Sequence, residues 1–190
     1  EPHKATWGDG PVSKQWQQGA ERLGNHVLTR CPRWLIFVEG VAGGPGYWWG
    51  ENLVGSDKQG VELSDPTKLV YAPHIEGPSS YMQPYFRDAL FPANMPHVWE
   101  EHFLKSREKT ETPFILGKMG GKLETAADVK WQKKAVEYFP SKGVGVFYAS
   151  LNPTGELGGL LQDDWTTPVD EKIEILSKLP STDVAKLRPV

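Results

Sequence analysis

Four ionisable side chains stand in short polar segments that begin or follow predicted strands: Glu1, His74, Glu76 and Lys118. A positioned carboxyl group can give or take a proton, and a carboxylate can also attack an electron-poor carbon. Lys118 follows a buried Pro-Phe-Ile-Leu run and opens a glycine-rich turn, a place where a strand presents a functional side chain. Its amine is a cation on a long stem, so it cannot act as a carboxylate nucleophile.

Apolar runs and helical spacing alternate along the chain and define the elements that position these groups. Continuous apolar runs are typical of parallel strands that are buried on both faces. The runs predict strands at residues 34–38, 68–72, 113–116 and 145–149. Apolar residues at helical spacing predict helices at residues 11–28, at 96–105, around Trp131, Ala135 and Tyr138, and from Thr167-Pro168 onward. Such alternation favours an α/β fold with a parallel sheet.

The number of strands limits the architecture. A (β/α)8 TIM-type barrel typically needs about 250 residues, whereas this chain has 190. Four complete strands and a remnant at the start therefore predict half of a barrel. We expect residues 1–180 to form this half-barrel domain and residues 181–190 to form a C-terminal tail.

Composition excludes several classes of partner and cofactor. The net charge of -3 gives no electrostatic reason to expect nucleic acid. No apolar run approaches the roughly 20 residues that span a bilayer, and no signal peptide is visible. His97 and His102 lack the spacing of a zinc site, and the glycines at 43–46 lack the lysine of a phosphate loop. We therefore expect no metal and no cofactor. The single cysteine, Cys31, either pairs outside the chain or is an inert thiol.

Several motifs occur in a fixed order along almost the whole chain. They lie at residues 1–3 (Glu-Pro-His), 34–40, 47–53, 74–78 (His-Ile-Glu-Gly-Pro), 117–120 (Gly-Lys-Met-Gly), 150–153 (Ser-Leu-Asn-Pro) and 158–166. The ordered set resembles the cellulase branch of family 5 of the glycoside hydrolases. The resemblance covers the C-terminal half of that family's barrel, from the end of the fourth strand onward. It implies a site at the carboxyl ends of the strands.

The resemblance assigns expected roles to Glu1 and Lys118. Retaining glycosidases use an acid/base and a nucleophile, both carboxyl groups, about 5 to 5.5 Å apart. Glu1-Pro2 matches the second half of the family's Asn-Glu-Pro motif, so Glu1 is expected to be the acid/base, unless it is only a frayed terminus. Lys118 stands where the family has its nucleophilic glutamate.

A second departure accompanies the first. The family usually has His-x-Tyr-Gly-Pro after the sixth strand, and Glu76 stands at the tyrosine position here. Because the two positions touch in the family, we predict that Glu76 and Lys118 form an ion pair in the former catalytic pocket. The alternative is that both side chains point separately into water.

Other residues are expected to bind sugar. By resemblance His74 contacts a sugar hydroxyl, although a satisfied pocket histidine is an equal alternative. Asn152 follows Leu151, which replaces the tryptophan that usually floors the cleavage point. Trp48 and Trp49 are the candidate sugar platform, with core packing as the default for at least one of them. Trp165 is expected to pack against the last turn.

These observations predict a catalytically inactive, cellulase-like protein with a structural or glycan-binding role in a larger extracellular or cell-wall assembly. The alternative is a portion of an active endo-β-1,4-glucanase that hydrolyses β-glucan. The expected partners are a β-glucan or other glycan, and another polypeptide or a missing N-terminal half that completes the barrel. Uncovered apolar faces and strand edges are the reason to expect this second partner.

Overall fold

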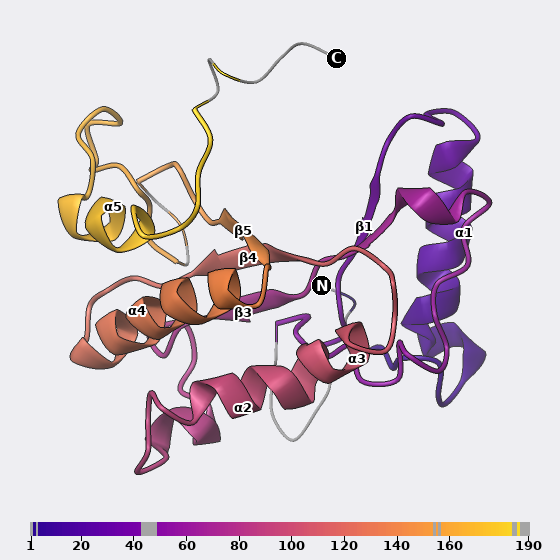
Figure 1. Cartoon of the computed structure of the whole chain (residues 1–190), viewed down its shortest axis with the longest axis horizontal. Coiled ribbons are helices and arrows are strands. Elements are labelled where there is room, and N and C mark those ends of the chain that lie inside the picture. The colour runs from indigo at the N-terminus through magenta and orange to yellow at the C-terminus, as the bar shows by residue number, and fades with distance from the viewer. Residues whose placement is uncertain are drawn as a thin grey trace.

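The structure is a computed structural model that describes residues 2, 4–42, 49–153, 155, 157–183 and 186. Strands alternate with helices in the described part, as predicted (Figure 1). The strands are β1 (Ile36–Val38), β2 (Leu69–Tyr71), β3 (His74–Glu76), β4 (Ile115–Gly120) and β5 (Gly145–Tyr148). The helices are α1 (Trp16–Leu28), α2 (Met95–Trp99), α3 (Lys105–Arg107), α4 (Ala126–Ser141) and α5 (Asp170–Leu176), with short turns η1 (Val12–Lys14), η2 (Pro66–Lys68), η3 (Pro84–Arg87) and the π-turn η4 (Glu100–Leu104).

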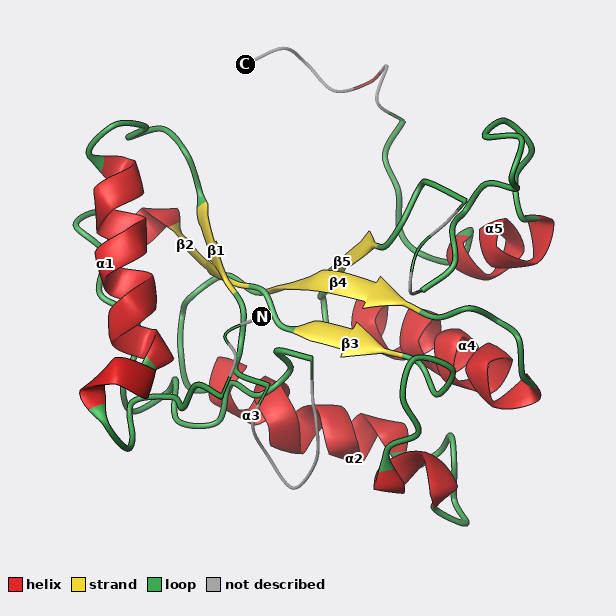
Figure 2. Ribbon diagram, turned by 180° about the vertical axis from the view of Figure 1, so that it is seen from behind, coloured by secondary structure: helices red, strands yellow, loops and turns green. Residues whose placement is uncertain are grey.

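All the strand pairs are parallel, in the order β1-β2 and β3-β4-β5. The predicted strand at 68–72 continues as β3 after an interruption at Pro73, which has no N–H to donate. Two hydrogen bonds carry the pairing across this break: Tyr71 N–H donates to the Pro113 carbonyl and Gly117 N–H donates to the Pro73 carbonyl, both at 3.0 Å. The two sheets therefore form one parallel array, which confirms the predicted α/β class (Figure 2).

The outer strands curve toward each other. Phe37 of β1 and Phe147 of β5 lie edge to face, with ring centroids 6.1 Å apart, although their strands are not neighbours. Both rings are about half exposed. The prediction that residues 34–38 are buried on both faces is wrong. Val38 is buried, but the side chains of Trp34, Leu35 and Phe37 are exposed. One face of β1 is covered by the helix layer, and the concave face of the sheet is open.

Helices α2 and α4 pack against each other beside the sheet. Trp99 of α2 contacts Phe139 and Trp131 of α4, with centroid separations of 4.6 and 6.5 Å. All three rings are buried. Helix α4 begins at the N-cap Thr125, whose hydroxyl accepts a hydrogen bond from the Asp128 N–H at 3.2 Å.

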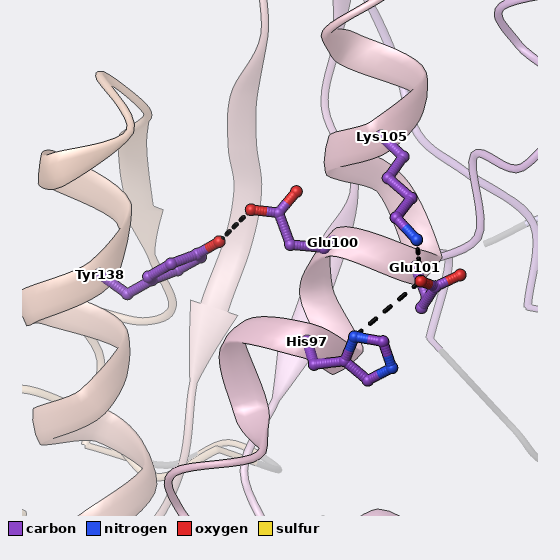
Figure 3. A network of polar contacts seen from close by, with 5 residues as sticks. All are labelled: His97, Glu100, Glu101, Lys105 and Tyr138. Carbon is purple, nitrogen blue, oxygen red and sulfur yellow. Dashed lines mark hydrogen bonds and ion pairs between the residues drawn. The ribbon is translucent and has the colours of Figure 1, made fainter.

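A polar network fastens the same two helices at their surface (Figure 3). Tyr138 of α4 donates a hydrogen bond to Glu100 of η4, and the Lys142 amine lies 2.6 Å from the same carboxylate. Partial burial opposes ionisation of Glu100, but these two hydrogen bonds outweigh it and lower the pKa of the carboxyl group. On the adjoining turn Glu101 pairs with Lys105, and His97 lies 3.9 Å away.

The segment before α5 differs from the prediction. Helix α5 begins at Asp170 rather than at Thr167-Pro168. Thr167 instead lies in a turn, in which its backbone N–H donates a hydrogen bond to the Asp164 carboxylate at 2.8 Å. Trp165, which was expected to pack against the last turn, is 61% exposed and has a φ of 60°. Its backbone N–H donates to the Gln162 carbonyl at 2.9 Å, so the turn directs the ring outward. This expectation is wrong.

No helix in the described residues combines the length and the apolar character needed to cross a membrane.

Candidate functional site

The predicted site residues of β3 and β4 lie side by side at the carboxyl ends of these strands. The register pairs His74 with Lys118 and Glu76 with Gly120. Side chains two residues apart project from the same face of a strand. His74 and Glu76 therefore share one face of β3, and Lys118 emerges beside them from β4.

Lys118 and Glu76 form the predicted ion pair. The amine nitrogen of Lys118 lies 2.5 Å from a carboxylate oxygen of Glu76. The Glu76 side chain is 3% exposed and that of Lys118 is 26% exposed, so the lysine supplies a counter-charge to an almost completely buried carboxylate. A carboxylate buried without such a partner would be costly. The ion pair is therefore confirmed, and the alternative of two separately solvated side chains is wrong.

A second acid–base contact lies next to this pair. The Nδ1 atom of His74 is 3.1 Å from the Glu39 carboxylate, and both side chains are about one-fifth exposed. Glu39 directly follows β1, so its carboxyl group reaches the same edge of the sheet as His74. Sequence reasoning placed Glu39 in a family-like motif and gave it no role. Its position immediately after a strand was the signal that it could reach the site.

The concave face of the sheet contains a cavity of about 520 Å³ beside these groups. Its walls combine aromatic rings, small residues and the Glu39–His74 contact: Trp16, Phe37, Glu39, Ala72, His74, Gly117 and Phe147. A mainly apolar wall with a few polar groups is the usual character of a ligand site. The cavity is therefore the described part of a candidate binding cleft.

A buried carboxylate supports the loops that follow β3 and β4. Asp128 is fully buried, and its Oδ1 atom accepts a hydrogen bond from the Ser79 N–H at 3.0 Å. The Ser79 hydroxyl accepts a hydrogen bond from the Lys122 N–H at 3.1 Å. A Cβ atom at Gly77 would lie 2.8 Å from the same Asp128 oxygen, so this close approach requires glycine. Both loops are thereby fixed relative to α4.

A second chain of hydrogen bonds connects β5 to the turn after β4. Tyr148 donates to Gln132 Oε1 at 2.9 Å, and Gln132 Nε2 donates to the Gly121 carbonyl at 3.1 Å. Burial raises the pKa of Tyr148 to about 12, so its phenol stays protonated and can keep donating. The turn that follows the strand carrying Lys118 is thereby held by α4 and β5.

A buried trio holds the segment that contains Trp49. The Nδ1 atom of His102 lies 3.1 Å from the Glu51 carboxylate, and the two side chains are 9% and 2% exposed. Burial raises the pKa of Glu51, although the neighbouring His102 and a hydrogen bond from Tyr85 oppose this rise. Burial, together with the Glu51 charge, also raises the pKa of Tyr85. Sequence reasoning missed this trio, because its members are far apart in the chain and follow no helical or strand spacing.

The remaining predicted site residues have different outcomes. Glu1 and Trp48 lie outside the described residues. Trp49 is in the core and only 5% exposed, which fits core packing, the other role allowed for it, rather than a sugar platform. Asn152 is half-buried in the turn after β5. That turn continues to Leu157, whose carbonyl accepts a hydrogen bond from the buried amine of Lys172 at 3.1 Å.

Among the described residues, no group of three or more His, Cys, Asp or Glu side chains is arranged to hold a metal ion. The polar groups at the strand ends instead contact one another, as the Lys118–Glu76 ion pair and the His74–Glu39 contact. Such an arrangement can bind hydroxyl-rich ligands through its remaining donor and acceptor positions.

Comparison with known proteins places this geometry in a family. The sequence model described as "Cellulase (glycosyl hydrolase family 5)" matches residues 1–155. An endoglucanase from Paenibacillus polymyxa is 39% identical over 98% of this chain and 50% of its own length. The major extracellular endoglucanase of Xanthomonas campestris pv. campestris is 41% identical over 96% of this chain and 39% of its own length.

Solved structures agree with these sequence matches. The catalytic domain of the Xanthomonas endoglucanase has a TM-score of 0.82 and 39% identity, and the match covers 92% of this chain and 53% of that domain. An endocellulase from Pyrococcus horikoshii in complex with cellotetraose gives a TM-score of 0.82 at 40% identity, over 92% of this chain and 50% of that one. This chain spans 39 to 53% of the length of these matched proteins. It belongs to glycosyl hydrolase family 5, the cellulase family.

Proposed function

We propose that the protein binds a β-1,4-glucan in a cellulase-type cleft and does not hydrolyse it through the family's carboxylate nucleophile. The observation that carries this proposal is the 2.5 Å ion pair between Lys118 and Glu76. By resemblance, Lys118 occupies the nucleophile position and Glu76 the position of its tyrosine neighbour. The pair replaces the two groups on which the family's displacement depends.

The chemistry of a retaining glycosidase explains the consequence. Its second carboxylate attacks the anomeric carbon and forms a covalent glycosyl–enzyme intermediate. A protonated lysine has no lone pair with which to attack, and an amine cannot form the glycosyl ester of this mechanism. Glu76 is almost completely buried and its charge is engaged by Lys118, so it is poorly placed to act as a substitute nucleophile.

Binding residues follow from the same site. His74, positioned by Glu39, is proposed to donate or accept a hydrogen bond from a sugar hydroxyl, and Asn152 is proposed to do the same from the other side. Trp48 remains the proposed stacking platform, since Trp49 is buried. Glu1 remains the proposed acid/base by resemblance. Cellotetraose bound to the Pyrococcus relative supports the choice of a β-glucan.

A second candidate function is endoglucanase activity. The curated relatives at 39% and 41% identity are named endoglucanases, and by themselves these names favour hydrolysis over an inactive state. By resemblance Lys118 stands at the nucleophile position, so a hydrolytic centre in this protein would need a carboxylate at another position. The two candidates therefore differ in a measurable way.

The barrel is proposed to be completed by a further polypeptide segment, from the same gene product or from another chain. The open concave face with the half-exposed Phe37 and Phe147, together with the half-length coverage of relatives, supports this completion. Residues 1–180 would then be the C-terminal half of the barrel, with a tail at 181–190. An extracellular or cell-wall location is proposed from the Xanthomonas relative, which is named as extracellular.

Calorimetric titration of the full native polypeptide with cellohexaose tests the binding proposal. We expect a measurable affinity that falls by about tenfold in a His74→Ala variant. The variant loses the proposed hydrogen bond between His74 and a sugar hydroxyl, and one such bond contributes roughly 1.5 kcal/mol to binding. The matched control is His97→Ala, which removes a histidine that is 77% exposed on α2. Absence of heat at saturating cellohexaose, or an equal loss in both variants, would contradict binding in this cleft.

The same proteins separate the two candidates when a soluble cellulose derivative is the substrate. The proposal expects no reducing ends above the blank from the unaltered polypeptide. A Glu76→Tyr/Lys118→Glu double variant, which restores both family residue types, is expected to acquire activity if the rest of the site is intact. Hydrolysis by the unaltered polypeptide would favour the second candidate.

A further inference from the structure

A groove of about 690 Å³ crosses the outer face of α4, on the side of the helix turned away from the sheet. We call it the lysine groove. Its lining combines apolar residues with five charged side chains: Pro92, Ala93, Lys130, Lys133, Lys134, Val136, Glu137, Pro140 and Lys178. Pro92 and Ala93 lie in the turn before α2, and Lys178 lies in the turn after α5, so the groove is lined by α4 and by the ends of two connecting segments (Figure 1).

The charge of the lysine groove is strongly one-sided. Four lysines face a single carboxylate, that of Glu137, which lies 3.1 Å from the Lys134 amine. No described carboxylate lies within ion-pair distance of Lys130, Lys133 or Lys178. The chain as a whole has a net charge of -3, so this local excess of positive charge is not a consequence of composition.

Helical spacing brings three of these cations together. Lys130 is three residues from Lys133 and four from Lys134, and side chains at these spacings are neighbours on a helix surface. Like charges at such positions repel and destabilise a helix by a few tenths of a kcal/mol. Trp131 and Ala135 occupy the opposite, buried face of α4, so packing against the sheet does not require lysine on the outer face.

The uncharged part of the groove is apolar and rigid. Val136 is buried, and Pro92 and Pro140 are half-buried. Proline rings have no donor and a fixed shape, so they suit flat apolar ligand surfaces such as the C–H faces of pyranose rings. Lysine amines above this floor supply point charges on flexible stems, which tolerate variable anion positions better than the planar guanidinium of arginine does.

We propose that the lysine groove binds an acidic polysaccharide whose sugar rings carry carboxylates. Uronate carboxylates would contact Lys130, Lys133 and Lys178, and the C–H faces of the rings would lie over the half-buried Pro92 and Pro140. The choice of a polysaccharide over an acidic peptide rests on the proposed glycan-binding function. A neutral β-glucan would gain nothing from the lysines, so this site and the cleft at the strand ends would bind different polymers.

Binding of this kind is electrostatic and therefore sensitive to salt. Exposed charges are largely screened beyond a Debye length, which is about 10 Å at 0.1 M ionic strength and about 3 Å at 1 M. The lysines would raise the association rate with a polyanion and hold the protein near it. The protein could then bind two polysaccharides at once, a neutral β-glucan in the cleft and an acidic polysaccharide on the outer face of α4.

Affinity electrophoresis and calorimetry of the full native polypeptide with polygalacturonate test the proposal. We expect binding that weakens steeply between low and high salt. A Lys130→Gln/Lys133→Gln variant should bind polygalacturonate about fivefold to tenfold more weakly, since exposed ion pairs contribute up to about 1 kcal/mol each. The matched control, Lys14→Gln/Lys58→Gln, makes the same change of net charge at two exposed lysines outside the groove and should change little.

Three outcomes would overturn the proposal: no binding at low salt, equal weakening in both variants, or binding of polyglutamate at least as tight as that of polygalacturonate. The last would identify an acidic peptide as the better ligand. Titration of the Lys130→Gln/Lys133→Gln variant with cellohexaose distinguishes this proposal from the cleft proposal. In this variant the proposal expects unchanged cellohexaose binding and weaker polygalacturonate binding. In the unaltered polypeptide, cellohexaose binding without polygalacturonate binding would overturn the lysine-groove proposal alone, and the reverse pattern would overturn the cleft proposal alone.

Discussion

The amine of Lys118 lies 2.5 Å from the carboxylate of Glu76, on adjacent parallel strands and at the edge of the sheet where the site is built. Two separate departures from a family pattern therefore meet in space as one contact. Without a lysine at position 118, the Glu76 carboxylate would be a buried charge without this counter-charge. The observed pair neutralises the buried Glu76 carboxylate. Under the proposed function, it also takes the place of the carboxylate that displacement needs.

The stability of the pair can be measured with a double-mutant cycle. Lys118→Met leaves the nearly buried Glu76 carboxylate without its counter-charge, and we expect the free energy of unfolding to fall by about 3 kcal/mol. Glu76→Gln should cost less, because the partly exposed Lys118 amine can reach water. The double variant should lose clearly less than the sum of the two single losses in urea unfolding. Strictly additive losses would show that the two groups do not interact.

Glu51 should make stability depend on pH. Burial raises the pKa of its carboxyl group above the ordinary 4.5, so the folded protein holds this proton more tightly than the unfolded chain. The stabilising contribution is complete below pH 4.5 and is lost as pH rises through the folded-state pKa. We expect the free energy of unfolding of the unaltered protein to fall, relative to Glu51→Gln, as pH rises above 4.5. Parallel pH profiles for the two proteins would refute this.

Lys172 should stabilise the loop after β5. Its buried amine donates to the carbonyls of Leu157 and Gly158 at 3.1 and 2.9 Å. Lys172→Met keeps the apolar stem and leaves both carbonyls without this donor, so we expect a loss of about 1 to 3 kcal/mol in the free energy of unfolding. Lys178→Met, at an exposed position just after the same helix, is the control and should stay within about 0.5 kcal/mol. Equal effects would mean that the buried contacts contribute nothing specific.

Asp164 should titrate far below an ordinary aspartate. The Thr167 hydroxyl and the backbone N–H groups of Thr166 and Thr167 donate to its carboxylate and lower its pKa to about 2. Its contribution to the turn is present above pH 3.8 and is lost as pH falls through about 2. The amide resonances of Thr166 and Thr167 should shift with a midpoint near pH 2, and Asp164→Asn should abolish the shift. A midpoint near 3.8 would contradict the turn geometry.

Local patterns in the sequence predicted the elements well where neighbours in the chain determine the structure. Helix α4 and the Lys118–Glu76 contact followed from periodicity and from the resemblance to the family. Strand β4 was predicted at residues 113–116 but runs from Ile115 to Gly120, so Lys118 lies within the strand rather than in the turn after it, because pairing with β3 extends the strand into the glycine-rich segment. Strand β3 (His74–Glu76) was not predicted, because two of its three residues are polar and were assigned to the segment that follows the strand at 68–72. The exposure of Phe37 was not predicted, since burial of a barrel strand depends on strands from the other half.

The candidate site was predicted less completely than the fold. Glu39 and the Glu51–His102 contact depend on which loops meet in space, and a single sequence carries no signal for such distant pairs. Trp49 shows the opposite problem: a tryptophan beside a predicted cleft suits stacking on sugar and packing in the core equally well. Only its burial at 5% distinguished the two.

Hydrolysis of carboxymethyl cellulose by the full native polypeptide tests the proposed inactivity most directly, with reducing ends measured against a blank that lacks protein. An endoglucanase preparation added to a second sample would verify that the substrate can be cleaved under the same conditions. We expect no release of reducing ends above the blank from the native polypeptide, because Lys118 stands at the proposed nucleophile position. Sustained release, dependent on enzyme concentration and inhibited by cellotetraose, would contradict it.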